Sequence, residues 1–221
     1  MGWIYLARFL PLLSCAAGPA WAADLPLWPL PDGFSSRPVA ERMWLNGVPL
    51  RVVFIGGVSR EEDFQREMDR SCRQEGGRFR QISLGRKHLW SCMDGPYSQT
   101  VRWHLEGGRI MGESSVLNLN AKAKTPAPIL ALPGQTQVLS ELETQDGSLR
   151  GRVEALQSSL SPAQIRSFFL REATADDWRL QGALSEKMTR LALEKGRESL
   201  DLAFSARPMG GSQTVLIWQK R

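Results

Sequence analysis

Apolar residues recur at helical spacing in two separate stretches of this chain. They are Phe64, Met68 and Cys72 in the first stretch and Ile165, Phe168, Phe169 and Ala173 in the second. Each stretch follows a capping-box pattern, in which a serine precedes Glu or Gln by three residues: Ser59 and Ser161 take this role. A proline follows Ser161 at the first helical position, where proline is favoured. The pattern predicts amphipathic helices over about 60–74 and from 162 onward.

Apolar and polar positions alternate with a period of two around both helices, which is typical of half-buried strands. Val101 and Trp103 point to one side, for example, and Arg102 and His104 to the other. The predicted strands are 49–55, 78–84, 88–93, 98–105 and 114–119, then 149–156, 178–183, 187–193, 199–204 and 213–218. The expected fold class is therefore α+β, with two related modules of one strand, one helix and further antiparallel strands.

Shifting the sequence by about 101 positions brings the two hydrophobic patterns into line, although residue identity stays at the level of chance. Val52 then aligns with Val153, and Met68 with Phe169. This predicts an internal duplication; two unrelated modules with similar patterning are the alternative. The expected organisation is a signal peptide (1–22), an extended proline-rich arm (23–42), a first module (43–120), a proline-rich linker (121–139) and a second module (140–221).

Residues 1–22 have the pattern of a bacterial export signal. Arg8 is followed by an apolar run, and Ala20-Trp21-Ala22 supplies the small residues that signal peptidases require. We expect cleavage before Ala23 and a periplasmic or secreted protein. No later stretch is apolar enough to span a bilayer, so no transmembrane segment is expected after cleavage. The minor alternative is a lipoprotein, because Leu12-Leu13-Ser14-Cys15 resembles a lipobox in which Cys15 is lipidated.

Export also determines how the remaining cysteines are interpreted. Cys72 and Cys92 form an even pair in an oxidising compartment, which predicts a disulfide. In the 101-residue alignment they match Ala173 and Leu193, both apolar. The first position lies on the inner side of a helix end and the second on the inner side of a strand. We therefore expect the two Cα atoms within about 7 Å of each other.

Motifs for catalysis or metal binding do not stand out in the sequence. His88 and His104 are the two histidines, and none of the G-x-S-x-G, S-x-x-K and H-E-x-x-H patterns occurs. We therefore name no catalytic residue, no metal ligand and no cofactor. A pair of carboxylates assembled in space would leave no such motif, so a periplasmic hydrolase using carboxylates stays open as an alternative.

Basic residues cluster from the end of the first predicted helix through the predicted hairpin after it. They are Arg70, Arg73, Arg78, Arg80, Arg86 and Lys87; Phe79 lies among them, and Trp90 follows shortly after Lys87. The chain as a whole carries 28 Lys and Arg against 23 Asp and Glu. Because export makes nucleic acid an unexpected partner, the cluster indicates a protein or an anionic envelope component. A merely solvated positive face is the alternative.

The expected function is that of an exported, non-enzymatic cell-envelope protein that acts by binding, such as an accessory of a surface or secretion assembly. Besides the hydrolase, a periplasmic carrier of a lipid or a small apolar ligand is an alternative. The tryptophans that could line such a carrier are Trp44, Trp90, Trp103, Trp178 and Trp218. Packing in the core is the competing explanation for these side chains.

Overall fold

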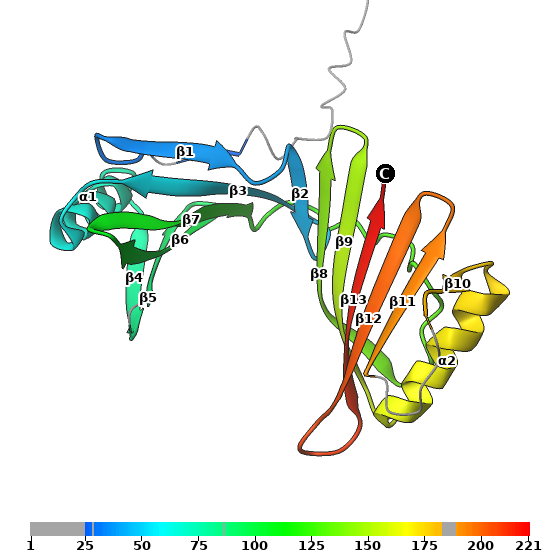
Figure 1. Cartoon of the computed structure of the whole chain (residues 1–221). Coiled ribbons are helices and arrows are strands. Elements are labelled where there is room, and N and C mark those ends of the chain that lie inside the picture. The colour runs from blue at the N-terminus through cyan, green and yellow to red at the C-terminus, as the bar shows by residue number, and fades with distance from the viewer. Residues whose placement is uncertain (1–24, 28, 86, 183–188) are drawn as a thin grey trace, which may run out of the picture.

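The computed structural model of the chain describes residues 25–27, 29–85, 87–182 and 189–221. The proposed signal peptide and Cys15 lie outside this range. Within it, the strands are β1 (Phe34–Pro38), β2 (Arg42–Leu45), β3 (Val48–Gly57), β4 (Arg78–Leu84), β5 (Lys87–Asp94), β6 (Tyr97–Glu106), β7 (Arg109–Asn118), β8 (Thr136–Asp146), β9 (Leu149–Ser158), β10 (Arg179–Leu180), β11 (Arg190–Lys195), β12 (Glu198–Ala206) and β13 (Ser212–Lys220). The helices are α1 (Glu61–Gln74) and α2 (Pro162–Ala175) (Figure 1).

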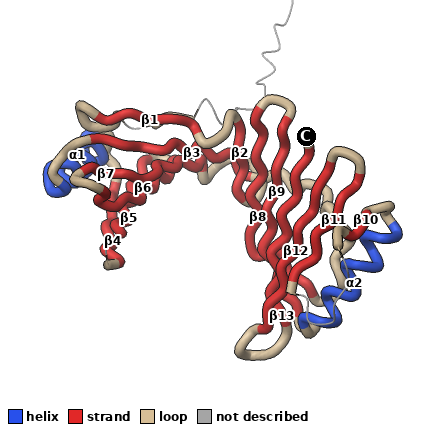
Figure 2. The backbone as a smooth tube through the Cα atoms, viewed as in Figure 1, coloured by secondary structure: helices blue, strands red, loops and turns tan. Residues whose placement is uncertain are grey.

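The predicted α+β fold class, with two helix-on-sheet modules, is wrong. All 13 strands belong to one antiparallel sheet, in the order β10-β11-β12-β13-β9-β8-β2-β3-β7-β6-β5-β4, with β1 paired to β3. The two halves are joined because β2 pairs with β8, so that Trp44 lies opposite Glu143. Figure 2 shows strands running through both halves, with the helices confined to the two ends. Each helix has only 14 residues, so strands dominate the described structure.

The strands that join the halves have weak sequence signals. β2 has only four residues, too few for a periodic pattern to be recognised. β8 reads TQVLSELETQD, and a register shift between Val138 and Ser140 interrupts its alternation. Of the predicted strand 178–183, only Arg179–Leu180 is observed as β10, and 183–188 lie outside the described residues. Because β2 and β8 were not among the predicted strands, the sequence suggested two modules instead of one sheet.

The two helices begin differently. At α2 the predicted capping box is confirmed: Ser161 Oγ accepts from the backbone N–H of Gln164, and Gln164 Oε1 accepts from that of Ser161. At α1 the predicted cap is wrong, because Arg60 is the N-cap residue and no side chain caps the helix. Ser59 Oγ instead donates to the carbonyl of Arg60. Acidic residues in the first turn of α1 favour its start through the helix dipole.

Helix α1 covers one core of the sheet. Its fully buried Phe64 and Met68 pack against side chains of β3, β5, β6 and β7, and Phe64 meets the Trp103 ring edge-on at 5.3 Å. Cys72 at the end of α1 forms a disulfide with Cys92 of β5, with 6.0 Å between the Cα atoms. The predicted pairing is confirmed, and it ties the helix to the sheet.

Helix α2 covers a second core at the other end of the sheet. Ile165, Phe169 and Ala173 are fully buried against strands β11, β12 and β13. Leu130, from the segment between β7 and β8, is buried in the same core. This segment therefore packs on the protein over part of its length.

The two cores are linked through the tight turn between β2 and β3. Asn46 and Gly47 both have positive φ, 51° and 75°. The Asn46 side chain accepts from the backbone N–H of Glu141 in β8 at 2.8 Å. The carbonyl of Gly47 accepts from the backbone N–H of Lys124 at 3.0 Å. The turn thus holds both β8 and the segment that precedes it.

Candidate anionic-partner interface

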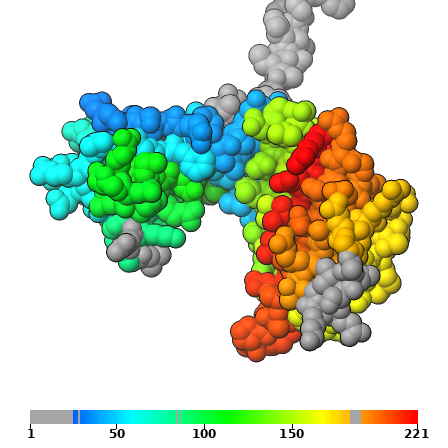
Figure 3. All heavy atoms as spheres, in the orientation of Figure 1, coloured from blue at the N-terminus to red at the C-terminus, as the bar shows by residue number. Residues whose placement is uncertain are grey.

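The predicted basic cluster surrounds one end of the sheet. Strand β4 pairs with β5 and with no other strand among the described residues, so β4 is an edge strand. Arg78 and Arg80 belong to β4, and Lys87 is the first residue of β5. Arg70 and Arg73 lie in the last part of α1, whereas Arg86 is outside the described residues. The β4–β5 hairpin projects from the molecule, well apart from the second half (Figures 1 and 3).

The cluster is divided between the two faces of β4. Phe79 lies directly opposite Cys92, which belongs to the α1 core, so Phe79 faces the helix. The guanidinium carbon of Arg73 lies 5.0 Å from the centroid of the Phe79 ring on that side. Because successive strand side chains alternate, Arg78 and Arg80 project from the opposite face. We call this face, the side of strands β1 and β3–β7 away from α1, the open face.

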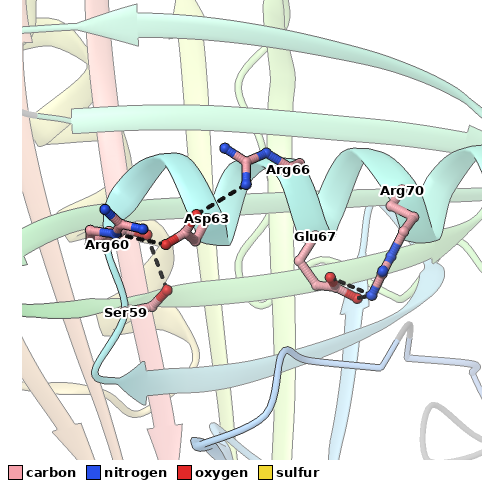
Figure 4. Close-up of polar contacts among 6 residues, drawn as sticks. All are labelled: Ser59, Arg60, Asp63, Arg66, Glu67 and Arg70. Carbon is pink, nitrogen blue, oxygen red and sulfur yellow. Dashed lines mark hydrogen bonds and ion pairs between the residues drawn. The ribbon is translucent and has the colours of Figure 1, made fainter.

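Three arginines along α1, but not Arg73, are compensated by neighbouring carboxylates. Along the exposed flank of α1, Arg60 and Arg66 both pair with Asp63, at 2.9 and 3.2 Å (Figure 4). Arg70 reaches both carboxylate oxygens of Glu67, at 2.5 and 2.6 Å. Most of the positive charge of this flank is therefore neutralised locally.

The hairpin cations have no such compensation. Within the described part of the chain, Arg78, Arg80 and Lys87 make no hydrogen bond or ion pair through their side chains, and all three are exposed. The sequence from 76 to 93 contains no Asp or Glu. Charge of one sign on an exposed hairpin produces a local positive potential that attracts anions. This hairpin is the main site of uncompensated charge in the predicted cluster.

The open face beside the hairpin combines further charges with exposed apolar groups. One row crosses six strands, each residue directly opposite the next: Ile82, Leu89, Arg102, Glu113, Phe54 and Arg37. Ile82 and Phe54 are 43% and 46% exposed, far more than core residues of this size. Arg102 pairs with Glu113, and Arg37 lies over the Phe54 ring. The row is amphipathic, with charges on either side of apolar side chains.

A hollow of about 580 Å³ opens on this face. Phe54 and Met111 contribute apolar surface to it, and Arg37, Lys87 and Arg102 contribute cations. No motif in the sequence distinguishes Arg37, Arg102 or Phe54 as binding residues. The alternation in 98–105 does assign Arg102 to the outer side, but its position opposite Phe54 depends on strand pairing between distant segments.

A second hollow, of about 290 Å³, lies beside the α2 core and contains carboxylates. Asp176 and Glu198 both line it, together with the rings of Trp178 and Trp218. The hydrogen bond from Lys195 lowers the pKa of Asp176, and that from Lys220 lowers the pKa of Glu198. Both groups are therefore held as carboxylates. A general acid of the glycosidase type needs a raised pKa, which neither group has.

A buried ionic group near the junction of the two halves was not foreseen from the sequence. Arg152 of β9 pairs with Glu141 at 2.8 Å and with Glu154 at 2.7 Å, and it donates to the carbonyl of Ala127 at 2.6 Å. Burial raises the pKa of Glu154, and the nearby Arg152 partly opposes this rise. Arg152 thus connects β8, β9 and the segment before β8, which is a structural role.

The tryptophans and histidines noted in the sequence mostly lie in the cores or beside them. Trp90 and Trp103 are fully buried in the α1 core, and Trp178 is buried in the α2 core. His88 stacks on Trp103 and lies 2.9 Å from a carboxylate oxygen of Glu61, whereas His104 is exposed. Among the described residues there is no cluster of three His, Cys, Asp or Glu side chains suited to a metal.

Comparison with known protein families, with curated proteins and with solved structures gave no match to this chain. No helix within the described ranges is long and apolar enough to cross a membrane.

Proposed function

We propose that this protein is an exported cell-envelope protein that acts by binding, and that the β4–β5 hairpin holds an anionic partner. The single observation that carries the proposal is the group of uncompensated cations Arg78, Arg80 and Lys87, exposed at the end of the sheet. The Cys72–Cys92 disulfide fits an oxidising compartment such as the periplasm or the cell exterior.

The surroundings of the hairpin support binding over a purely solvated surface. Exposed Ile82 and Phe54 lie on the same face as the cations, in the row that crosses the sheet. Apolar groups beside uncompensated charges are typical of interfaces, in which charge guides the encounter and apolar contact adds affinity. The disulfide fixes β5 to α1, so the hairpin is presented by an anchored strand.

Salt dependence tests this proposal. Binding of the mature protein to immobilised polyglutamate and to vesicles containing an anionic lipid would be measured from about 0.1 M to about 1 M NaCl. Over this range the Debye length falls from about 10 Å to about 3 Å. We expect binding to at least one of the two probes, with an affinity that falls steeply as salt rises.

The double variant Arg78→Glu/Arg80→Glu should abolish most of this binding. Arg179→Glu/Arg197→Glu is the matched control, because it changes the net charge equally at exposed positions of the second half that have no side-chain partner within the described residues. If both variants lose the same amount of binding, the loss is explained by the change in net charge alone, and a specific site on the hairpin is refuted. Absence of binding to both probes would refute the proposed function itself.

A further inference from the structure

We infer that the outer edge of β4 binds an extended acidic polypeptide segment as an additional strand of the sheet. This inference rests on the proposed function, and it names the class of partner that the hairpin recognises. An edge strand offers backbone N–H and C=O groups that have no partner in the sheet, and an extended peptide can pair with them.

Strand β4 is the edge best suited to such pairing. Three strands of the described structure pair along one side only: β1, β4 and β10. β10 has two residues, and β1 has five and includes Pro38. Short length and proline are common devices that protect sheet edges from pairing. β4 has seven residues and no proline, so neither device protects it.

The charges beside this edge select the kind of strand that can bind. Arg78 and Arg80 project on the open face, and Arg73 lies over Phe79 on the helix face. A strand added to β4 therefore meets arginines on both of its faces. In a second copy of this chain, the β4 edge would bring arginines against arginines, and this repulsion disfavours pairing between copies. An acidic strand would meet opposite charges at the same positions.

The same arrangement favours a polypeptide over an anionic lipid surface. A flat surface contacts one face of a hairpin, so it would use Arg78 and Arg80 but not Arg73 behind them. An added strand lies in the plane of the sheet and reaches the cations of both faces. Exposed Ile82, on the same face as Arg80, supplies an apolar contact for the residue of that strand that lies beside it.

The test uses the mature protein and a synthetic peptide of alternating glutamate and valine, with a peptide of the same composition in block order as the control. In an added strand, N–H groups that point toward β4 come from every second residue. Two further peptides carry N-methyl groups, one on all glutamates and the other on all valines. We expect one N-methylated peptide to bind like the parent and the other to bind at least 10-fold more weakly.

The role of charge is tested with protein variants. Arg78→Glu/Arg80→Glu should weaken binding of the parent peptide at least 10-fold. Arg179→Glu/Arg197→Glu should leave it within about 2-fold. Equal binding of the parent and both N-methylated peptides would overturn strand addition while the proposed function stands. Binding to anionic vesicles without binding to the peptide would overturn it in the same way, and binding to neither would refute both proposals.

Discussion

Replacing Gly47 with alanine tests how firmly the segment before β8 is docked on the turn between β2 and β3. Gly47 has a φ of 75°, a backbone conformation that costs a non-glycine residue about 1–2 kcal/mol. A Cβ atom at this position would lie 1.8 Å from the carbonyl oxygen of Lys124. Carbon–oxygen contacts normally measure about 3.3 Å or more, so the backbone at Lys124 would have to move by more than an ångström.

That displacement has an energetic cost of its own. The Lys124 N–H donates to the Gly47 carbonyl at 3.0 Å, and loss of one such hydrogen bond costs about 0.5–1.5 kcal/mol. Together with the backbone strain, we expect Gly47→Ala to lower the free energy of unfolding by roughly 1.5–3.5 kcal/mol. The matched control is Gly108→Ala in the turn between β6 and β7. Gly108 has a φ of 74°, and its Cβ would meet nothing within 4 Å, so only the strain of about 1–2 kcal/mol applies.

Urea unfolding followed by tryptophan fluorescence measures both variants against the parent protein. The informative quantity is the difference between the losses in free energy of unfolding of the two variants. Because Gly47 and Gly108 have nearly equal φ values, the backbone strain cancels in this difference. If Gly47→Ala and Gly108→Ala lose the same stability, the close approach of Lys124 to the turn contributes nothing. The proposed contribution of this docked segment to stability would then be refuted, whereas the pairing of β2 with β8 would not be affected.

Three other interactions give shorter tests by the same unfolding assay. Reduction of the Cys72–Cys92 disulfide, which closes a loop with a sequence separation of 20, should cost about 3 kcal/mol; an unchanged midpoint after reduction would contradict this. Arg152→Met leaves two buried carboxylates unpaired and should cost about 3–5 kcal/mol at pH 7. Because burial raises the pKa of Glu154, part of this loss should be recovered as pH falls and Glu154 becomes protonated; a loss independent of pH would argue against the buried ion group. Glu198→Gln should destabilise the protein at neutral pH, because the hydrogen bond from Lys220 lowers the pKa of this carboxyl below its ordinary 4.5. The charged form of Glu198 stabilises the fold at pH values above its ordinary pKa. The difference in free energy of unfolding between the variant and the parent should therefore vanish as pH falls through the lowered pKa.

Local sequence signals predicted the parts of the fold that depend on neighbouring residues. The start of α2 followed from Ser161, Pro162 and Gln164, which interact within one turn of helix. The disulfide followed from the positions of its two cysteines on a helix end and a strand. By contrast, the cap of α1 was misplaced by one residue: the capping-box pattern favours Ser59, whereas the helix follows Arg60 without a side-chain cap and the Ser59 hydroxyl donates to the Arg60 carbonyl.

The single sheet could not be predicted because it depends on contacts between distant segments. Pairing of β2 with β8 joins residues about 100 positions apart, such as Trp44 and Glu143, and neither strand has a strong periodic pattern. The buried Arg152 is a related case. Charged residues are ordinarily exposed, and only the carboxylates brought to Arg152 by β8 and β9 make its burial tolerable.

The basic cluster shows how sequence and structure divide the information about a binding site. A period of two places Arg78 and Arg80 on one face of a strand, and this could be deduced from the sequence alone. Whether that strand lies inside the sheet or at its edge could not be deduced, because it depends on which strands pair with it. The structure leaves one side of β4 without a neighbouring strand among the described residues. An interior strand would have its backbone groups satisfied, and its arginines would offer only a charged face. At an edge, the same arginines flank free hydrogen-bonding groups, which makes an extended acidic chain the complementary partner.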